Sequence, residues 1–160
     1  MALAFEKRLT PATRLPQPPD TVETESKLNI SVVFTSVEAT LPALKEAGAL
    51  ASALGAHITL VVPQVVPYAL PLSSPLVLLD WNERRLRVIA DESRVETTVH
   101  LYLCRDRLQA LLAALKPHSL VLVGGRKRWW WPSAEERLGR SLRHAGHEVI
   151  FCGNGVSSHA

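Results

Sequence analysis

Short apolar runs alternate with longer amphipathic stretches along this chain. Residues 30–34 and 120–123 are runs of branched and aromatic residues, a pattern typical of buried β-strands. Over residues 40–54, apolar positions recur at helical spacing, with charged residues on the other side. Residues 57–62 are again apolar on both faces. A strand, a helix and a strand of these lengths predict a βαβ unit, and therefore a parallel sheet.

The remaining segments continue this alternation. Helices are predicted over 76–91, 106–115 and 133–144, and strands over 95–104 and 148–152. Residues 63–75 are rich in proline and are predicted to form a loop that covers the sheet. The chain is therefore expected to be an α/β protein in which helices lie on both faces of a mostly parallel sheet.

Polar and helix-breaking residues mark the predicted helix ends. Thr35 and Ser36 follow the first strand and can cap the helix after it. Pro42 is tolerated in a first helical turn. Ser133 with Glu136 three residues later makes a capping box, which predicts a helix start.

The two ends of the chain differ from its centre. Four prolines lie within residues 1–27, so this segment is predicted to be a disordered leader. Residues 28–152 are expected to form the α/β domain, and 153–160 a flexible tail. The first ten residues lack the apolar region of a signal peptide, and no apolar run reaches the ~20 residues of a membrane helix. We therefore expect a cytoplasmic protein without membrane contact.

Composition and motifs limit the range of possible functions. The net charge of +3 gives no strong reason to expect nucleic acid as the partner. Cys104 and Cys152 have no zinc-ligand spacing, and two buried structural thiols are the favoured interpretation. Nucleophile-elbow and Walker motifs are lacking. His144 and His147 are three residues apart, but Gly146 breaks the helix between them, so a metal-binding pair is not expected. A non-catalytic role is therefore favoured.

The stretch 119–133 is the best candidate site. Gly124 and Gly125 follow the most apolar strand and allow close approach of a ligand to the backbone. The helix predicted to start at Ser133 offers free N–H groups to an anion. Three cations lie between them, namely Arg126, Lys127 and Arg128, and arginine suits bidentate phosphate contacts. The alternative is that this loop is a solvated cationic surface.

Trp129, Trp130 and Trp131 follow these cations. Three adjacent indoles on a loop do not all point into one core, so at least one is expected to be exposed or covered by a partner. They can form a lid over a crevice, stack on bases, make a dimer contact or fill a vacant nucleotide site. A plug or a protein contact is favoured.

Several of these segments together resemble the universal stress protein family, which has the adenine nucleotide alpha hydrolase-like fold. The resemblance covers about residues 28–152. It is carried by Thr35-Ser36 after the first strand, Ala-Leu-Gly-Ala-His-Ile-Thr-Leu-Val-Val at 53–62, Leu-Val-Leu-Val-Gly-Gly at 120–125, Leu-Arg-His-Ala-Gly at 142–146 and Glu-Val-Ile-Phe at 148–151. It implies a doubly wound, five-stranded parallel sheet in the order 3-2-1-4-5.

The resemblance also implies a ligand site at the carboxyl edge of the sheet. Strand order reverses between the first and fourth strands, and ligands bind at such a point. Thr35 and Ser36 are therefore expected to meet Gly124 and Gly125 there, with Val62 at the end of the second strand.

The family motifs are altered in this chain. Nucleotide-binding members have an Asp just after the first strand, where this chain has Thr35 or Ser36. They also have a G-x-x-G turn, followed after nine residues by Gly-Ser or Gly-Thr. Counted from Gly125, the second and third glycines correspond to Arg128 and Leu138. The resemblance implies ATP or AMP as the ligand, and the altered motifs indicate a diverged nucleotide or other phosphate site.

Two hypotheses follow for the function. The first is a binding or signalling domain of the stress response, of universal-stress-protein type and dimeric. The second is a structural or interaction module in which Trp129–Trp131 close the vacant nucleotide crevice and which acts through dimer or partner contacts.

Overall fold

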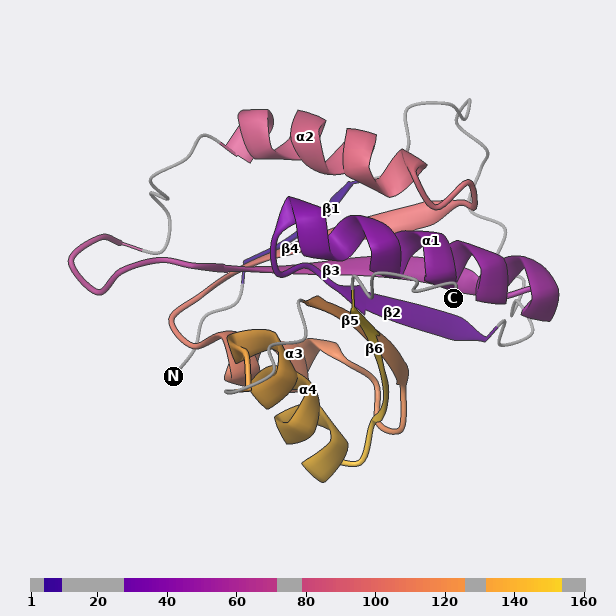
Figure 1. The fold of residues 1–160 in the computed structure, drawn as a ribbon. Coiled ribbons are helices and arrows are strands. Elements are labelled where there is room, and N and C mark those ends of the chain that lie inside the picture. Colours follow the sequence, from indigo (N-terminus) through magenta and orange to yellow (C-terminus); the bar gives the residue numbers. More distant parts are fainter. Residues whose placement is uncertain (1–4, 10–27, 72–78, 126–131, 154–160) are drawn as a thin grey trace, which may run out of the picture.

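Six strands form one sheet in the computed structural model, which describes residues 5–9, 28–71, 79–125 and 132–153 (Figure 1). The strands are β1 (Phe5–Leu9), β2 (Asn29–Val33), β3 (His57–Val65), β4 (Thr97–Cys104), β5 (Leu120–Gly125) and β6 (Glu148–Gly153). The helices are α1 (Val37–Leu54), α2 (Leu79–Asp91), α3 (Arg107–Ala114) and α4 (Ala134–His144). The sheet order is β1-β4-β3-β2-β5-β6, and β2 to β6 are parallel. These five strands have the predicted order 3-2-1-4-5, so the predicted α/β fold class is confirmed.

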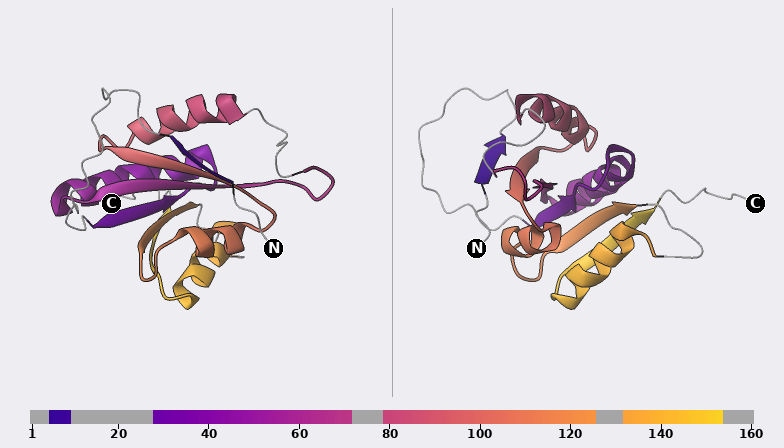
Figure 2. Two further views of the ribbon diagram at one scale, coloured as in Figure 1. Left: turned by 180° about the vertical axis from the view of Figure 1, so that it is seen from behind. Right: turned by 90° about the vertical axis from the view of Figure 1, so that its left-hand side faces the viewer.

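Helices cover both faces of the sheet (Figures 1 and 2). Val32 and Val33 are adjacent in β2 but belong to different cores, because successive side chains of a strand point to opposite faces. Val32 packs with Leu44 of α1 in the core that α1 and α2 cover. Val33 packs with Leu111 of α3 and Leu142 of α4 in the other.

The predicted capping residues do cap helices, but α1 begins earlier than expected. Ser36 is its N-cap, with Oγ accepting a hydrogen bond from the N–H of Ala39 at 3.3 Å. Because the helix starts at Val37, Pro42 lies beyond the first turn, and its predicted position in that turn is wrong. The capping box of Ser133 and Glu136 is confirmed at the start of α4.

β1 lies in the segment that was predicted to be disordered. Phe5–Leu9 pairs antiparallel with β4, with Phe5 opposite Leu103 and Leu9 opposite Val99. The prolines of the leader all follow residue 10, so they do not prevent pairing here. The structure differs from the prediction for this strand, and the rest of the leader lies outside the described residues.

β3 continues past Val62 into the segment that was predicted to be a loop. The carbonyl of Val61 accepts a hydrogen bond from the N–H of Phe34 at 2.9 Å, so the polar groups of Val61 face β2. Two residues later, Pro63 faces the same side, where β2 has already ended. A proline is tolerated there because no strand needs its missing N–H. One side of the β3 extension is therefore left open.

Two further expectations can be compared with the structure. Cys104 and Cys152 are buried and free, as predicted. Within the parts of the chain that the structure describes, no helix is long and apolar enough to cross a membrane.

Candidate functional site

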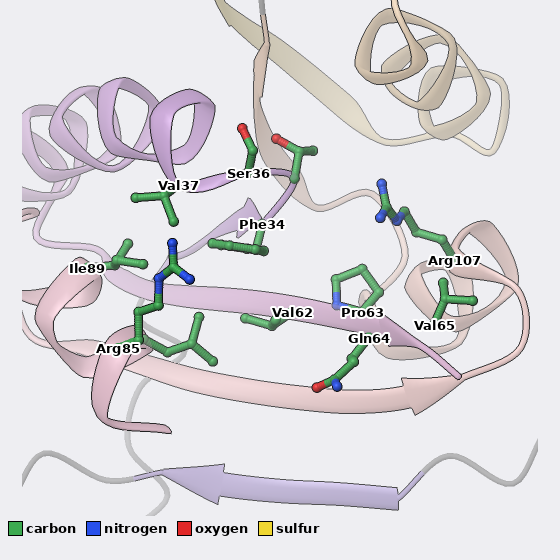
Figure 3. Close-up of a pocket in the computed structure, with 12 residues that line it drawn as sticks. Phe34, Ser36, Val37, Val62, Pro63, Gln64, Val65, Arg85, Ile89 and Arg107 are labelled. Atoms are coloured by element: carbon green, nitrogen blue, oxygen red, sulfur yellow. The ribbon is translucent and has the colours of Figure 1, made fainter. Parts of the chain in front are cut away.

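A cavity of about 480 Å³ opens at the carboxyl ends of β2 and β3, beside the open side of the β3 extension. This volume lies within the range of small-molecule sites, about 300–1,000 Å³. The lining comes from the β2–α1 junction, β3, α2 and α3 (Figure 3). It consists of Phe34, Thr35, Ser36, Val37, Val62, Pro63, Gln64, Val65, Arg85, Leu86, Ile89 and Arg107.

Two arginines bring positive charge to the lining of the cavity. Arg85 comes from α2 and Arg107 from the first position of α3, and Figure 3 shows them entering from opposite ends. Asp106 caps α3 by accepting a hydrogen bond from the N–H of Gln109 at 2.8 Å, which fixes the backbone at Arg107. None of the described lining residues is acidic. The cavity therefore favours an anionic group.

The start of α1 also borders the cavity. Ser36 and Val37 line the cavity at the point where the helix begins, and the carboxylate of Glu38 in the first turn offsets the partial positive charge of this helix N-terminus. Phe34, Val62 and Ile89 contribute apolar surface. The arrangement suits a molecule that has both an apolar part and an anionic part.

Arg105 ties the segment after β3 to the end of β4. Its guanidinium donates hydrogen bonds to the carbonyls of Val66 at 2.9 Å, Leu70 at 2.7 Å and Pro67. It also lies 5.1 Å from the ring centroid of Tyr68. The segment that follows β3 is therefore held by Arg105 together with the hydrogen bond from the N–H of Val66 to the carbonyl of Cys104 at 2.8 Å.

Thr35 joins the ends of β2 and β5. Its hydroxyl donates a hydrogen bond to the carbonyl of Gly124 at 3.0 Å, and its N–H donates to Oγ1 of Thr40 at 3.3 Å. The two strand ends that were expected to meet are thus side by side. The Thr35 hydroxyl serves this link, however, so its proton is already committed within the protein.

Gly124 and Gly125 lie in β5 and not in a turn after it, which corrects the prediction. A Cβ at Gly124 would be 1.7 Å from the carbonyl oxygen of Ala39, because the first turn of α1 lies directly on this strand. A Cβ at Gly125 would be 2.7 Å from Phe151 Cζ and 2.8 Å from Glu135 Cβ. Both glycines are therefore required for packing, and neither is among the cavity residues.

Ser133 and the start of α4 are also engaged within the protein. Ser133 Oγ accepts a hydrogen bond from the N–H of Glu136, and Glu136 Oε2 accepts one from the N–H of Ser133, both at 3.1 Å. Glu135 and Glu136 place two carboxylates in the first turn. These carboxylates, and the donors they use, disfavour a phosphate at this helix start.

The predicted site residues therefore separate into groups. Thr35, Ser36 and Val62 line the cavity, whereas Gly124, Gly125 and Ser133 lie elsewhere. Arg126, Lys127, Arg128 and Trp129–Trp131 lie outside the described residues.

Sequence reasoning missed Arg85, Arg107 and Gln64 as lining residues. A signal existed for Arg107: it follows a parallel strand, and the carboxyl ends of all such strands meet at one edge of the sheet.

Cys104 lies near this edge but is not suited to act as a nucleophile. Burial raises the pKa of its thiol, although the nearby Arg107 acts to lower it and Asp106 to raise it. Its Sγ donates to the carbonyl of Gln64 at 3.6 Å. Within the described residues, no group of three or more His, Cys, Asp and Glu side chains could hold a metal ion.

Fold and cavity together define a doubly wound α/β domain with a cavity at its carboxyl edge. No protein-family model matches the sequence, and a comparison with curated proteins finds no match.

Proposed function

We propose that this chain is a universal-stress-protein-like binding domain whose carboxyl-edge cavity takes a small anionic ligand, with a nucleotide such as AMP or ATP as the first candidate. One observation carries the proposal, namely that Arg85 and Arg107 line the two ends of one cavity beside the start of α1. The 3-2-1-4-5 order of the parallel strands supports the family assignment. In this proposal the anionic groups of the ligand contact Arg85 or Arg107 at the two ends of the cavity, and not the glycines of β5.

The proposed role is binding without catalysis. The described lining offers hydroxyl, amide and guanidinium groups, which bind and orient a ligand. A general base is normally a histidine or a carboxylate, and neither is among these residues. A cytoplasmic location belongs to the proposal and is supported by the free thiols of Cys104 and Cys152, which are typical of a reducing compartment.

Isothermal titration with ATP, AMP, a cyclic nucleotide and inorganic phosphate tests the proposal. Arg107→Ala and Arg85→Ala should each weaken binding about five- to tenfold, because a hydrogen bond to a charged group contributes about 1–1.5 kcal/mol at an exposed site. Arg84→Ala and Arg137→Ala are matched controls, since both arginines are exposed and neither lines the cavity. Absence of heat with every ligand would refute the proposal, as would equal losses in the control variants.

The interaction-module hypothesis is the second candidate. It is favoured by the β5 side of the crevice, where the first turn of α1 lies on Gly124 and leaves no room for a ligand. In this proposal the protein is a homodimer or binds another protein, and Trp129–Trp131 make the contact. Sedimentation of Trp130→Ala should then show a changed oligomeric state. An unchanged profile for all three Trp→Ala variants would count against this role.

A further inference from the structure

β1 occupies the outer edge of β4. β4 is the only element with which β1 makes more than a marginal contact, and their pairing is antiparallel, unlike every other strand pair in the described sheet (Figure 2). The outer edge of a strand presents unpaired N–H and C=O groups that can pair with another segment. Here, five residues of the same chain pair with Val99 to Leu103 of that edge.

β4 is well supported without β1. It pairs with β3 along its whole length, from Thr97 to Cys104. Val99 and Leu101 are buried in the core beneath α1 and α2, and Tyr102 is buried in the core that includes α3. Because these contacts fix β4 from both faces and from one edge, its other edge is a preformed template for an extended strand.

The connection between β1 and β2 is longer than the distance it must cover. Leu9 pairs with Val99, which shares a row of the sheet with Leu60 and Val32. Three strand spacings separate Leu9 from that row of β2, about 14 Å. Residues 10–28 can span about 60 Å when extended. β1 can therefore leave β4 without pulling on β2.

We propose that the β4 edge is a binding surface for an extended peptide strand, which β1 occupies until a segment of another protein replaces it. Recognition of this kind depends on main-chain hydrogen bonds, so the partner is an extended, antiparallel segment of five or more residues without proline. A tethered strand has an effective concentration in the millimolar range, so the intact chain binds such a partner weakly until β1 is released. This surface is separate from the cavity and does not depend on the proposed function.

Release of β1 in the full-length chain tests this inference. The N–H groups of adjacent strand residues point to opposite sides, so either Glu6 or Lys7 donates to β4 whatever the phase of the ladder. The double variant Glu6→Pro/Lys7→Pro removes both donors, and Glu6→Ala/Lys7→Ala keeps them as the matched control. A fluorescent peptide of residues 1–12 should bind the proline variant at least tenfold more tightly than the wild type or the alanine variant. The same peptide carrying the two prolines should not bind.

The proposal would be overturned if the anisotropy of the labelled peptide were the same with the wild type, the alanine variant and the proline variant. It would also be overturned if the peptide, at millimolar concentration, did not bind a folded proline variant. Amide hydrogen exchange of the wild type provides a second readout if the proline variant does not fold. The amides of β4 that face β1 should exchange faster than those of β3, because β1 opens locally. Equal protection of both sets would also refute an exchangeable β1.

Discussion

Substitution of Gly124 by alanine tests whether this glycine serves packing or a ligand. The added Cβ would lie 1.7 Å from the carbonyl oxygen of Ala39 and 2.5 Å from its carbonyl carbon. Both are backbone atoms of the first turn of α1, so no side chain can rotate away. A carbon and an oxygen in contact need about 3.3 Å, so α1 and β5 must separate by about 1.5 Å.

The expected loss of stability follows from this displacement. Overpacking of a core costs about 1–3 kcal/mol, and the upper end applies because backbone must move. The same movement strains the hydrogen bond from Thr35 to the carbonyl of Gly124, which contributes about 1 kcal/mol. The free energy of unfolding should therefore fall by about 3–4 kcal/mol, with a decrease in Tm of about 10 °C.

Gly139→Ala is the matched control. Gly139 lies within α4, and its added Cβ would meet Val149 Cγ1 at 3.5 Å, an ordinary contact. Alanine is favoured over glycine inside a helix, so this variant should gain about 0.5–1 kcal/mol. Urea unfolding measures both changes. The packing role of Gly124 would be refuted if Gly124→Ala lowered the free energy of unfolding by less than about 1 kcal/mol, or if Gly139→Ala lowered it more than Gly124→Ala does.

Two further predictions concern the segment after β3 and the thiol of Cys152. Arg105→Ala should raise the rate of chymotryptic cleavage at Tyr68 about tenfold, since the hydrogen bonds to the carbonyls of Val66, Pro67 and Leu70 are lost. Arg84→Ala should leave that rate unchanged, and an equal rate in both variants would contradict the assigned role. Burial, followed by the hydrogen bond and the charge of Glu46, raises the pKa of Cys152 from 9.0 to about 12, so this thiol should not react with a disulfide reagent at pH 8 until the chain unfolds. Because the pKa of Cys152 is higher in the folded state, the contribution of this thiol to the free energy of unfolding is complete below pH 9 and is lost as the pH rises towards 12. Cys152→Ala should therefore reduce the loss of stability at alkaline pH. The same loss of stability in the variant and the wild type would contradict the raised pKa.

Most of the fold could be predicted because its signals are local. The apolar runs that became β2, β3 and β5 and the caps Ser36 and Ser133 are all readable within a few residues. Other features depend on distant neighbours. Pro63 is tolerated in β3 only because β2 ends earlier, and β1 exists because β4 has a free edge.

The candidate site was less predictable for the same reason. Gly124 follows a strand as a ligand-binding glycine does, yet the residue that requires it is Ala39, far away in the sequence. Arg85 has no local signal that separates it from an ordinary solvated cation on a helix, and its place in the cavity lining depends on the packing of α2 against β4. The position at the carboxyl edge and three of the lining residues, Thr35, Ser36 and Val62, were predictable, whereas Arg85 and Gln64 were not.

Mapping of a bound nucleotide by NMR tests the central claim most directly. In a titration with AMP, we expect amide shift changes at Ser36, Val37, Gln64 and Arg107, and the Arg107→Ala variant should lose them. The amides of Gly125 and Ser133 should shift little, because both residues are packed within the protein. Changes centred on Gly125 and Ser133, or no changes at saturating AMP, ATP and phosphate, would contradict the account.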